Sequence, residues 1–159
     1  MEIRRSTKND LAEITAVYTY ARKFMKEHGN PNQWGDRKPE ETRVFADIEE
    51  GHSYVCTENG KIGCVFSFEI TEEPTYRVID GKWQNEKTYG VIHRIATNGT
   101  CKGMASYCMK WAYDKHPNIR IDTHKDNIPM QSLLKKLGFV YCGTIRLQDG
   151  SERMAFQKT

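Results

Sequence analysis

Residues 89–106 read Tyr89-Gly-Val-Ile-His-Arg-Ile-Ala96, Thr97-Asn-Gly-Thr-Cys-Lys-Gly103 and Met104-Ala-Ser106. The first run is typical of a strand, the second of a tight turn, and the third of the start of a helix. A helix start has unpaired backbone N–H groups and the positive end of the helix dipole. Glycine in the turn lets a ligand approach the backbone closely, and Lys102 adds a positive charge. We therefore expect this turn to bind a phosphate or pyrophosphate.

The residues that follow extend this unit by a second strand and a second helix. The strand is predicted at residues 119–123, and polar residues up to Asn127 come directly after it. Met130, Leu133 and Leu134 then recur at helical spacing, before the helix ends at Gly138. Strands that alternate with helices in this way predict an α/β fold with a mixed sheet.

In their order and spacing, the turn, Asp126-Asn127 and Leu137-Gly-Phe139 resemble the GNAT family of N-acetyltransferases. The pyrophosphate loop of that family reads Gln/Arg-x-x-Gly-x-Gly/Ala, and the corresponding residues here are Thr100-Cys-Lys-Gly-Met-Ala105. The Gly and the Ala of the pattern are present. Thr100 replaces the leading Gln or Arg, and Cys101 replaces a glycine that is common in the family.

The N-terminal half is predicted to supply two helices and a hairpin. After a short strand at residues 2–5, the first helix starts at Thr7-Lys-Asn-Asp10 and extends to about His28. The second helix has a proline in its first turn, and its expected buried face is Val44, Phe45 and Ile48. Strands at 52–57 and 62–70 are joined by Asn59-Gly60, which is typical of a type I′ turn.

Residues 71–87 are polar and are predicted to form a loop or small hairpin, and two final strands are expected at 139–147 and 153–157. The resemblance covers nearly the whole chain and implies a single N-acetyltransferase-like domain over residues 1–159. Its fold class is α/β, with a mixed, mostly antiparallel sheet flanked by helices in the order β-α-α-β-β-β-α-β-α-β-β.

The composition limits the classes of function. With 159 residues, of which 38% are hydrophobic and 28% charged, the chain has the size and composition of one soluble globular domain. A net charge of +3 suits an anionic small molecule and does not indicate nucleic acid. No apolar run approaches the ~20 residues of a membrane span, and the N-terminus has no apolar signal-peptide core. The five cysteines form no Cys-x-x-Cys pair, so we expect reduced thiols, a cytoplasmic protein and no metal site.

The resemblance implies that acetyl-CoA lies between the strand ending at Thr97 and the strand at residues 119–123. Backbone groups of the first strand would pair with the pantetheine arm, the turn would hold the pyrophosphate, and Asn127 would bind pantetheine or order its own helix start. The implied cofactor-binding residues are Ile95, Ala96, Thr97, Cys101, Lys102, Gly103, Met104, Ala105, Ser106 and Asn127. The alternative for the turn is an ordinary strand-to-helix connection that contains a glycine.

The catalytic groups are less well indicated. Many family members have a tyrosine four positions before the glycine of Gly-Phe, where it protonates the departing thiolate, and this chain has Leu134 there. His124 and Tyr141 are the nearby candidates for that role. Imidazole is a common proton acceptor near neutral pH, so His93 is a candidate general base or acceptor contact; the alternative is a hydrogen-bonded structural histidine. Strict alternation places His93 and Arg94 on opposite faces of the strand.

The acceptor is expected between the loop after the first helix and the loop before the cofactor strand, where Trp34 and Trp83 offer aromatic walls. Each tryptophan could instead anchor its loop on the core. The resulting hypothesis is acetyl transfer from acetyl-CoA to the primary amine of a small molecule or peptide, by a protein that resembles a family in which homodimers are common. One alternative is a CoA-binding sensor or regulatory module without turnover, and another is a domain that uses the turn for a different phosphate.

Overall fold

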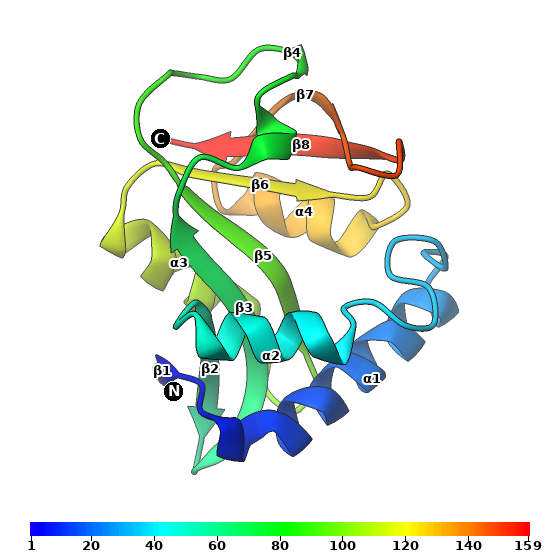
Figure 1. Cartoon of the computed structure of the whole chain (residues 1–159), viewed down its shortest axis with the longest axis vertical. Helices are drawn as coiled ribbons and strands as arrows, with labels where there is room; N and C mark the ends of the chain where they lie inside the picture. Colours follow the sequence, from blue (N-terminus) through cyan, green and yellow to red (C-terminus); the bar gives the residue numbers. More distant parts are fainter.

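The computed structural model describes residues 1–159 and contains eight strands and four α-helices (Figure 1). The strands are β1 (Glu2–Arg5), β2 (Ser53–Glu58), β3 (Lys61–Ile70), β4 (Asp80–Gly81), β5 (Gly90–Thr97), β6 (Ile119–Thr123), β7 (Val140–Arg146) and β8 (Glu152–Lys158). The helices are α1 (Leu11–Glu27), α2 (Glu41–Glu49), α3 (Met104–Lys115) and α4 (Ile128–Lys136). Two short 3₁₀ helices, η1 (Lys8–Asp10) and η2 (Pro74–Tyr76), precede α1 and β4.

All eight strands form one sheet in the order β1-β2-β3-β5-β6-β8-β7-β4. Every neighbouring pair is antiparallel except β5 and β6, which are parallel. The expected α/β class and element order are confirmed, and the predicted loop before β5 contributes the additional two-residue strand β4. Figure 1 shows β5 and β6 starting together and then diverging, which divides the sheet into two halves.

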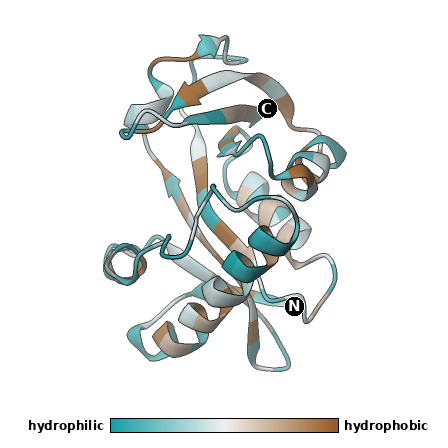
Figure 2. Ribbon diagram, turned by 90° about the vertical axis from the view of Figure 1, so that its right-hand side faces the viewer, coloured by the Kyte–Doolittle hydropathy of each residue, from teal (hydrophilic) through white to brown (hydrophobic).

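The helices pack on opposite faces of the sheet. Helices α1 and α2 cover one face, where residues such as Val17 and Ile48 contact Val55 and Val65. Helices α3 and α4 cover the other face, through a cluster that includes Cys108 and Leu134. Hydrophobic segments, brown in Figure 2, recur along the central strands, while the connecting loops are mostly hydrophilic. This two-sided cover holds β5 and β6 at the centre of the protein.

Local sequence signals account for several of these elements. Asn59 and Gly60 have φ values of 53° and 76°, as the predicted type I′ turn requires. Asn127 caps α4 by accepting a hydrogen bond from the N–H of Met130 at 3.1 Å. The expectation for α2 was partly wrong, because its buried residues are Val44, Asp47 and Ile48, whereas Phe45 is exposed. The buried Asp47 of this helix pairs with Arg94 of β5, which explains its burial.

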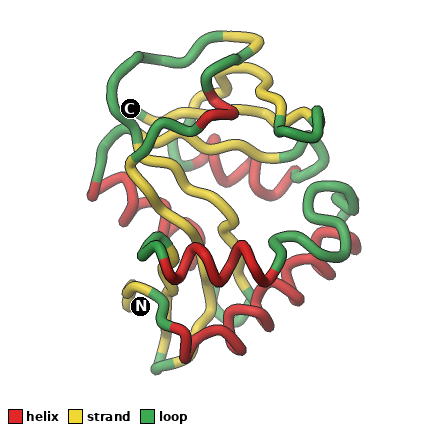
Figure 3. The backbone as a smooth tube through the Cα atoms, viewed as in Figure 1, coloured by secondary structure: helices red, strands yellow, loops and turns green.

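Two long loops, green in Figure 3, connect α1 to α2 and β3 to β5. The second loop has a hydrophobic cluster of its own, in which Tyr76, Trp83 and Tyr89 pack against Cys142 and Ile145 of β7. None of the four α-helices combines the length and apolar composition needed to cross a membrane. The loop between β3 and β5 is anchored on the sheet by its own hydrophobic cluster.

Candidate functional site

The edge of β5 that faces β6 lacks a strand partner over most of its length. The two strands pair only at Gly90↔Ile119 and Val91↔Arg120, whereas β5 stays paired with β3 as far as Thr97. Residues 92–97 therefore present one edge of the backbone to the opening between the strands. Such an edge can pair with an extended, amide-bearing ligand as if the ligand were an added strand. The predicted residues Ile95, Ala96 and Thr97 lie on this edge.

The unpaired edge leads to the start of α3. The first hydrogen bond of that helix is donated by the N–H of Tyr107 to the carbonyl of Gly103, at 3.0 Å. None of the hydrogen bonds outside the regular elements is donated by the N–H groups of residues 101–106. Six consecutive N–H groups at the positive end of a helix could hold a pyrophosphate.

The backbone of this loop depends on Gly103. Its φ of 78° lies in the left-handed region, and a Cβ placed there would meet nothing within 4 Å. Lys102 and Gly103 are exposed, and Cys101, Ala105 and Ser106 are partly exposed, while Met104 is buried and anchors the helix start in the core. The loop is thus anchored in the core at Met104 and exposed to solvent at Lys102 and Gly103. An anion needs such an exposed backbone to bind.

A cavity of about 660 Å³ occupies the opening between β5 and β6 and extends beneath α2. Its walls come from β5, β6, α2, the α1–α2 loop and the residues after β3, and they include His93, Asp122, Arg94, Trp34, Glu73 and Asn127. Pockets for small ligands commonly measure about 300–1,000 Å³. Most of these wall residues are polar, so the cavity suits a polar ligand held by ionic groups.

Glu73 and His93 are in contact inside this cavity. His93 Nε2 lies 3.6 Å from Glu73 Oε2, and the hydroxyl of Thr75 donates to the other carboxylate oxygen at 3.0 Å. Proximity to His93 lowers the pKa of Glu73, against partial burial, which raises it. The carboxylate is therefore charged at neutral pH and orients the imidazole ring. The Glu73 N–H donates to the Tyr89 hydroxyl at 2.9 Å, which holds the backbone that carries this carboxylate.

A second polar group in the cavity is Asp122, which is bonded by Tyr76 from behind the cavity wall. The Tyr76 hydroxyl donates to Asp122 Oδ2 at 2.6 Å, and the Tyr76 ring lies 6.3 Å from the His93 ring. Tyr76 is buried, and burial, together with Asp122, raises its pKa well above the ordinary value. Tyr76 therefore stays protonated and keeps donating to Asp122. Arg153 also lines the cavity and uses two of its nitrogens on the carbonyls of Glu152 and Gln33.

The strand β5 contains a bulge at Arg94. The expected alternation, with His93 and Arg94 on opposite faces of the strand, is therefore wrong at this point. Arg94 has a φ of 54°, and the register between β3 and β5 shifts at this point. As a result His93 and Arg94 both line the same cavity. The strained conformation is fixed by two partners, because Tyr18 donates to the Arg94 carbonyl at 2.7 Å and Asp47 accepts two hydrogen bonds from its guanidinium, both at 2.7 Å.

The loop between α1 and α2 contributes Trp34 and Gln33. Trp34 lines the cavity and packs edge-to-face on Tyr18, with ring centroids 5.6 Å apart. The Asn127 amide donates to Gln33 Oε1 at 2.9 Å while its oxygen caps α4. The side chain of Asn127 therefore orders the helix start, one of the two roles expected for it, and also joins the loop to α4.

Three of the predicted catalytic and acceptor-contact residues lie outside this cavity. Trp83 is buried in the loop cluster, where its Nε1–H donates to the Tyr76 carbonyl at 2.9 Å. Tyr141 is half exposed on β7 and packs on Phe156. His124 accepts a hydrogen bond from the Asp126 N–H at 3.0 Å, and burial and Arg153 lower its pKa, so its ring is neutral. These three residues remain candidates by sequence only, and the structure does not bring them together with His93.

Sequence reasoning missed Glu73, Tyr76 and Asp47 as site residues. Each reaches its partner over a separation of 20 to 47 residues, so no local spacing marks it. The one available signal was the acidic residue on the otherwise apolar face of α2, since a buried carboxylate requires a partner. No group of three His, Cys, Asp or Glu side chains is arranged to hold a metal ion.

Comparison with known proteins gives a consistent result. The acetyltransferase (GNAT) domain profile matches residues 1–140. A GNAT-family acetyltransferase from Streptococcus agalactiae is 32% identical, with 99% of this chain and 94% of that chain covered and a TM-score of 0.90. A Staphylococcus aureus Mu50 protein is 25% identical, with 100% and 99% covered and a TM-score of 0.75.

A third solved structure, of a Salmonella typhimurium protein with its cofactor acetyl-CoA, shares the fold at 19% identity and a TM-score of 0.65, with 98% of this chain and 91% of that chain covered. No curated protein sequence matches the chain significantly. The domain profile spans most of the chain, and the Streptococcus agalactiae relative is similar over its whole length. The chain therefore belongs to the GNAT acetyltransferase family.

Proposed function

We propose that this protein is an acetyl-CoA-dependent N-acetyltransferase that acts on the primary amine of a small molecule or peptide. The observation that carries the proposal is the continuity of three features: the N–H groups of residues 101–106, the unpaired edge of β5, and the cavity that contains Glu73 and His93. An elongated thioester fits the first two features, and an amine fits the third. Residues 1–159 would act as one cytoplasmic domain.

The cofactor would be held mainly by backbone groups. The N–H groups of residues 101–106 and the charge of Lys102 would bind its pyrophosphate. The edge of β5 from Ile95 to Thr97 would pair with its pantetheine arm, and an N–H on this edge would stabilise negative charge on the reacting carbonyl oxygen. Acetyl-CoA supplies the activated acetyl group as a thioester. This arrangement explains why Thr100 and Cys101 can replace other residues of the family pattern: the side chains there are not the binding groups.

The amine must lose a proton to become a nucleophile, and His93 is the residue we assign to accept it. Its ring lines the cavity beside the unpaired edge and is oriented by the charged carboxylate of Glu73. Asp122, whose oxygen accepts from Tyr76, would help to hold the positive amine before transfer. We assign no residue to protonation of the sulfur, because Leu134 is fully buried at the position where many family members have a tyrosine.

A CoA-binding sensor without turnover is the second candidate, and the buried Leu134 is the observation that favours it. The two candidates are separated by two measurements on one sample. Calorimetric titration with acetyl-CoA, and with ATP as the control, tests the cofactor. A thiol-release assay with a panel of amino acids, polyamines, aminoglycosides and peptides tests turnover. Binding of acetyl-CoA with release of CoA in the presence of one amine class supports the enzyme, and binding without release for any amine supports the sensor.

A homodimer is a further part of this proposal. It is tested by light scattering of the purified protein with and without acetyl-CoA. A mass of twice the 18.5 kDa chain would support a dimer, and a mass of one chain in both conditions would contradict it.

A further inference from the structure

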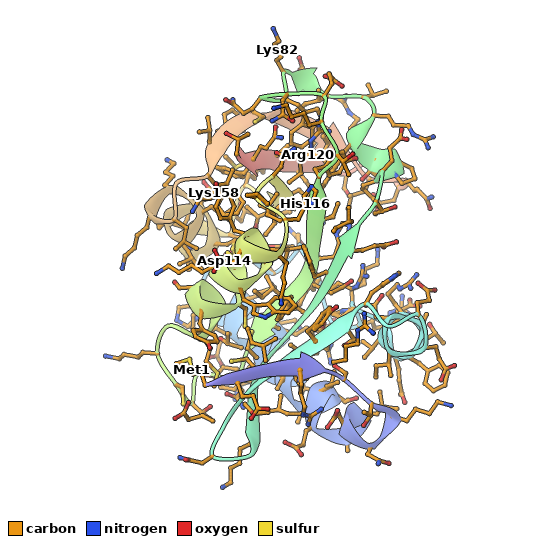
Figure 4. All side chains as sticks on the ribbon, turned by 90° about the vertical axis from the view of Figure 1, so that its left-hand side faces the viewer. Met1, Lys82, Asp114, His116, Arg120 and Lys158 are labelled. Carbon is orange, nitrogen blue, oxygen red and sulfur yellow. The ribbon has the colours of Figure 1, made fainter.

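A second cavity, of about 650 Å³, lies at the other end of the β5–β6 pair, under the loop that precedes β5. Its floor is Arg120 of β6, and its walls include Trp83 and Tyr89. Figure 4 labels Arg120 within the upper half of the sheet and shows Lys82 extending into solvent from the loop above it. Tyr76 lines this cavity, while its hydroxyl bonds Asp122 in the first one, so one side chain separates the two cavities.

Arg120 is a buried cation without a carboxylate partner. Its residue exposure is 4%, and it takes part in none of the ion pairs of the protein. Its Nη2 donates to the Asn85 carbonyl at 2.8 Å, but its Nε, which is buried, has no hydrogen-bond partner. A buried charge of this kind is costly unless it is paired, and a buried N–H without an acceptor adds to that cost. The Arg120 Nε–H therefore has no acceptor within the chain, and no carboxylate forms an ion pair with the guanidinium.

The guanidinium is held in place by aromatic rings. Its carbon lies 4.2 Å from the centroid of Trp83 and 4.0 Å from that of Tyr89. These contacts stabilise the positive charge and fix the plane of the group, but they use none of its N–H donors. Nη1 makes no hydrogen bond and Nη2 has a second N–H, so these two nitrogens stay available for a carboxylate or phosphate, which a guanidinium binds through two parallel hydrogen bonds.

The loop that covers Arg120 is also built rigidly. Gln157 is fully buried and accepts from the Gln84 N–H at 2.7 Å, while its amide donates to Asn118 Oδ1 at 2.7 Å. Asn118 in turn donates to the Thr88 carbonyl at 3.0 Å. This network ties both ends of the loop segment 84–88 to the sheet, so the position of Arg120 is preorganised and does not depend on a mobile cover.

The charges around the cavity favour an anion. Four cations and two carboxylates line it: Arg77, Lys82, Lys87, Arg120, Glu72 and Glu86. One of the carboxylates, Glu72, is already paired with Arg77 at 3.0 Å. Lys82 and Lys87 therefore add positive charge at the mouth of the cavity, above the buried guanidinium, and Glu86 is the one acid that opposes them.

We propose that Arg120, Trp83 and Tyr89 form a binding site for a small oxyanion, a carboxylate or a phosphate, that is separate from the cofactor loop. This proposal is independent of acetyl transfer, because the anion would bind at the opposite end of β5 from residues 101–106. One bound anion would account for the buried guanidinium without a carboxylate partner, the excess of cations around it and the ordered loop. It also gives Trp83 a binding role in a different cavity from the one expected for it.

The test follows the Arg120 side-chain Nε–H resonance by NMR, assigned through its loss in Arg120→Lys. Inorganic phosphate and acetate are titrated separately at constant ionic strength, with chloride as the reference anion. Because phosphate can also bind at the cofactor loop, the titrations are repeated in Gly103→Asp, which places a negative charge there. We expect a saturable shift with at least one of the two oxyanions, in both the wild type and Gly103→Asp. Which anion shifts the resonance separates the carboxylate source from the phosphate source.

In Arg120→Lys we expect the affinity measured by calorimetry in the Gly103→Asp background to fall roughly tenfold or more, because lysine cannot form the paired hydrogen bonds. If that variant does not fold, the Arg120 Nε–H resonance is assigned through its bonds to the Arg120 backbone, and the titrations of the wild type and Gly103→Asp decide alone. The proposal is overturned if the Arg120 resonance does not shift with either oxyanion in folded protein, or if the shift disappears in Gly103→Asp. Neither result depends on whether acetyl-CoA is bound or consumed.

Discussion

The loop at the start of α3 and the cavity beneath α2 offer different kinds of binding groups. At the start of α3, the binding groups are backbone N–H groups of residues 101–106, and a single glycine sets the geometry. In the cavity beneath α2, the groups are side chains joined in pairs, such as His93 with Glu73 and Arg94 with Asp47. The loop is therefore tolerant of side-chain replacement, while the cavity depends on partners that lie far apart in the sequence.

Because of this difference, substitutions in the two regions should have different effects. A change at Lys102 or Gly103 should alter cofactor binding and leave folding almost intact, because both residues are exposed. A change in the cavity should alter catalysis or stability and leave cofactor binding almost intact. Four predictions test this separation, and they are ordered by the size of the expected effect.

The largest effect is expected for His93→Gln. Glutamine can keep a polar contact with Glu73 but cannot accept a proton from the amine, so the rate of acetyl transfer should fall roughly a hundredfold to a thousandfold. The measurement is kcat/KM for the amine identified in the acceptor panel, together with the Kd of acetyl-CoA, which should change less than about threefold. His28→Gln is the matched control, since His28 is exposed at the end of α1. Equal rates for the two variants would remove His93 from catalysis.

The second prediction concerns the stability of the bulge. Asp47→Asn removes the charge that pairs with Arg94 and Arg43 and leaves a partly buried guanidinium without its counter-ion. The free energy of unfolding, from urea titration, should fall by about 3 kcal/mol. The control is Glu27→Gln, which removes an exposed i,i+4 pair with Lys23 and should change stability by less than about 0.5 kcal/mol. A loss for Asp47→Asn as small as that of the control would show that the bulge does not depend on this pair.

The same contrast explains which features could be predicted from the sequence. The helix start after Gly103, the Asn59-Gly60 turn and the cap at Asn127 are each set by residues within a few positions, and local chemistry indicated them. The bulge at Arg94 was not predicted, because its causes, Tyr18 and Asp47, lie 76 and 47 residues away. A strict alternation rule fails at such a bulge, as it does in many strands next to functional sites.

The cavity walls could not be predicted for a related reason. Which side of a loop meets the cavity depends on how the loop packs on the sheet. Trp34 and Trp83 have similar loop contexts in the sequence, but Trp34 packs on Tyr18 and lines the first cavity, whereas Trp83 packs on Tyr76 and lines the second. Tertiary packing, not residue type, assigned the two tryptophans to different sites.

The third prediction tests the effect of a negative charge added at Gly103, in the loop before α3. Asparagine and aspartate have the same shape, and both tolerate the left-handed φ of Gly103, where a Cβ meets nothing within 4 Å. Gly103→Asp should weaken CoA binding roughly a hundredfold, because its carboxylate would lie beside the pyrophosphate. Gly103→Asn should weaken binding only a few-fold, and both variants should unfold at nearly the same urea concentration. Equal affinities for the two variants would show that no anion lies at this loop.

The smallest effect is the pH dependence contributed by Glu73. Its pKa is lowered in the folded protein, from an ordinary value of 4.5, chiefly by His93. A lowered carboxyl pKa stabilises the folded state above the unfolded-state value, and that stabilisation is lost as pH falls through the folded-state pKa. The difference in unfolding free energy between wild type and Glu73→Gln should therefore be about 1 kcal/mol or less at pH 6 and should decline below pH 4.5.

Thr75→Val sharpens this measurement, because it keeps the Glu73 charge and removes only the hydroxyl that donates to it at 3.0 Å. It should reproduce part of the loss seen at pH 6 with Glu73→Gln, and the same decline below pH 4.5. Gly103→Asn, in which the loop gains no titratable group, should follow the wild-type pH profile throughout. A pH-independent difference for Glu73→Gln would mean that Glu73 acts through packing alone. The contrast between a loop that binds through its backbone and a cavity held by charged pairs would then hold for Arg94 and Asp47 but not for His93 and Glu73.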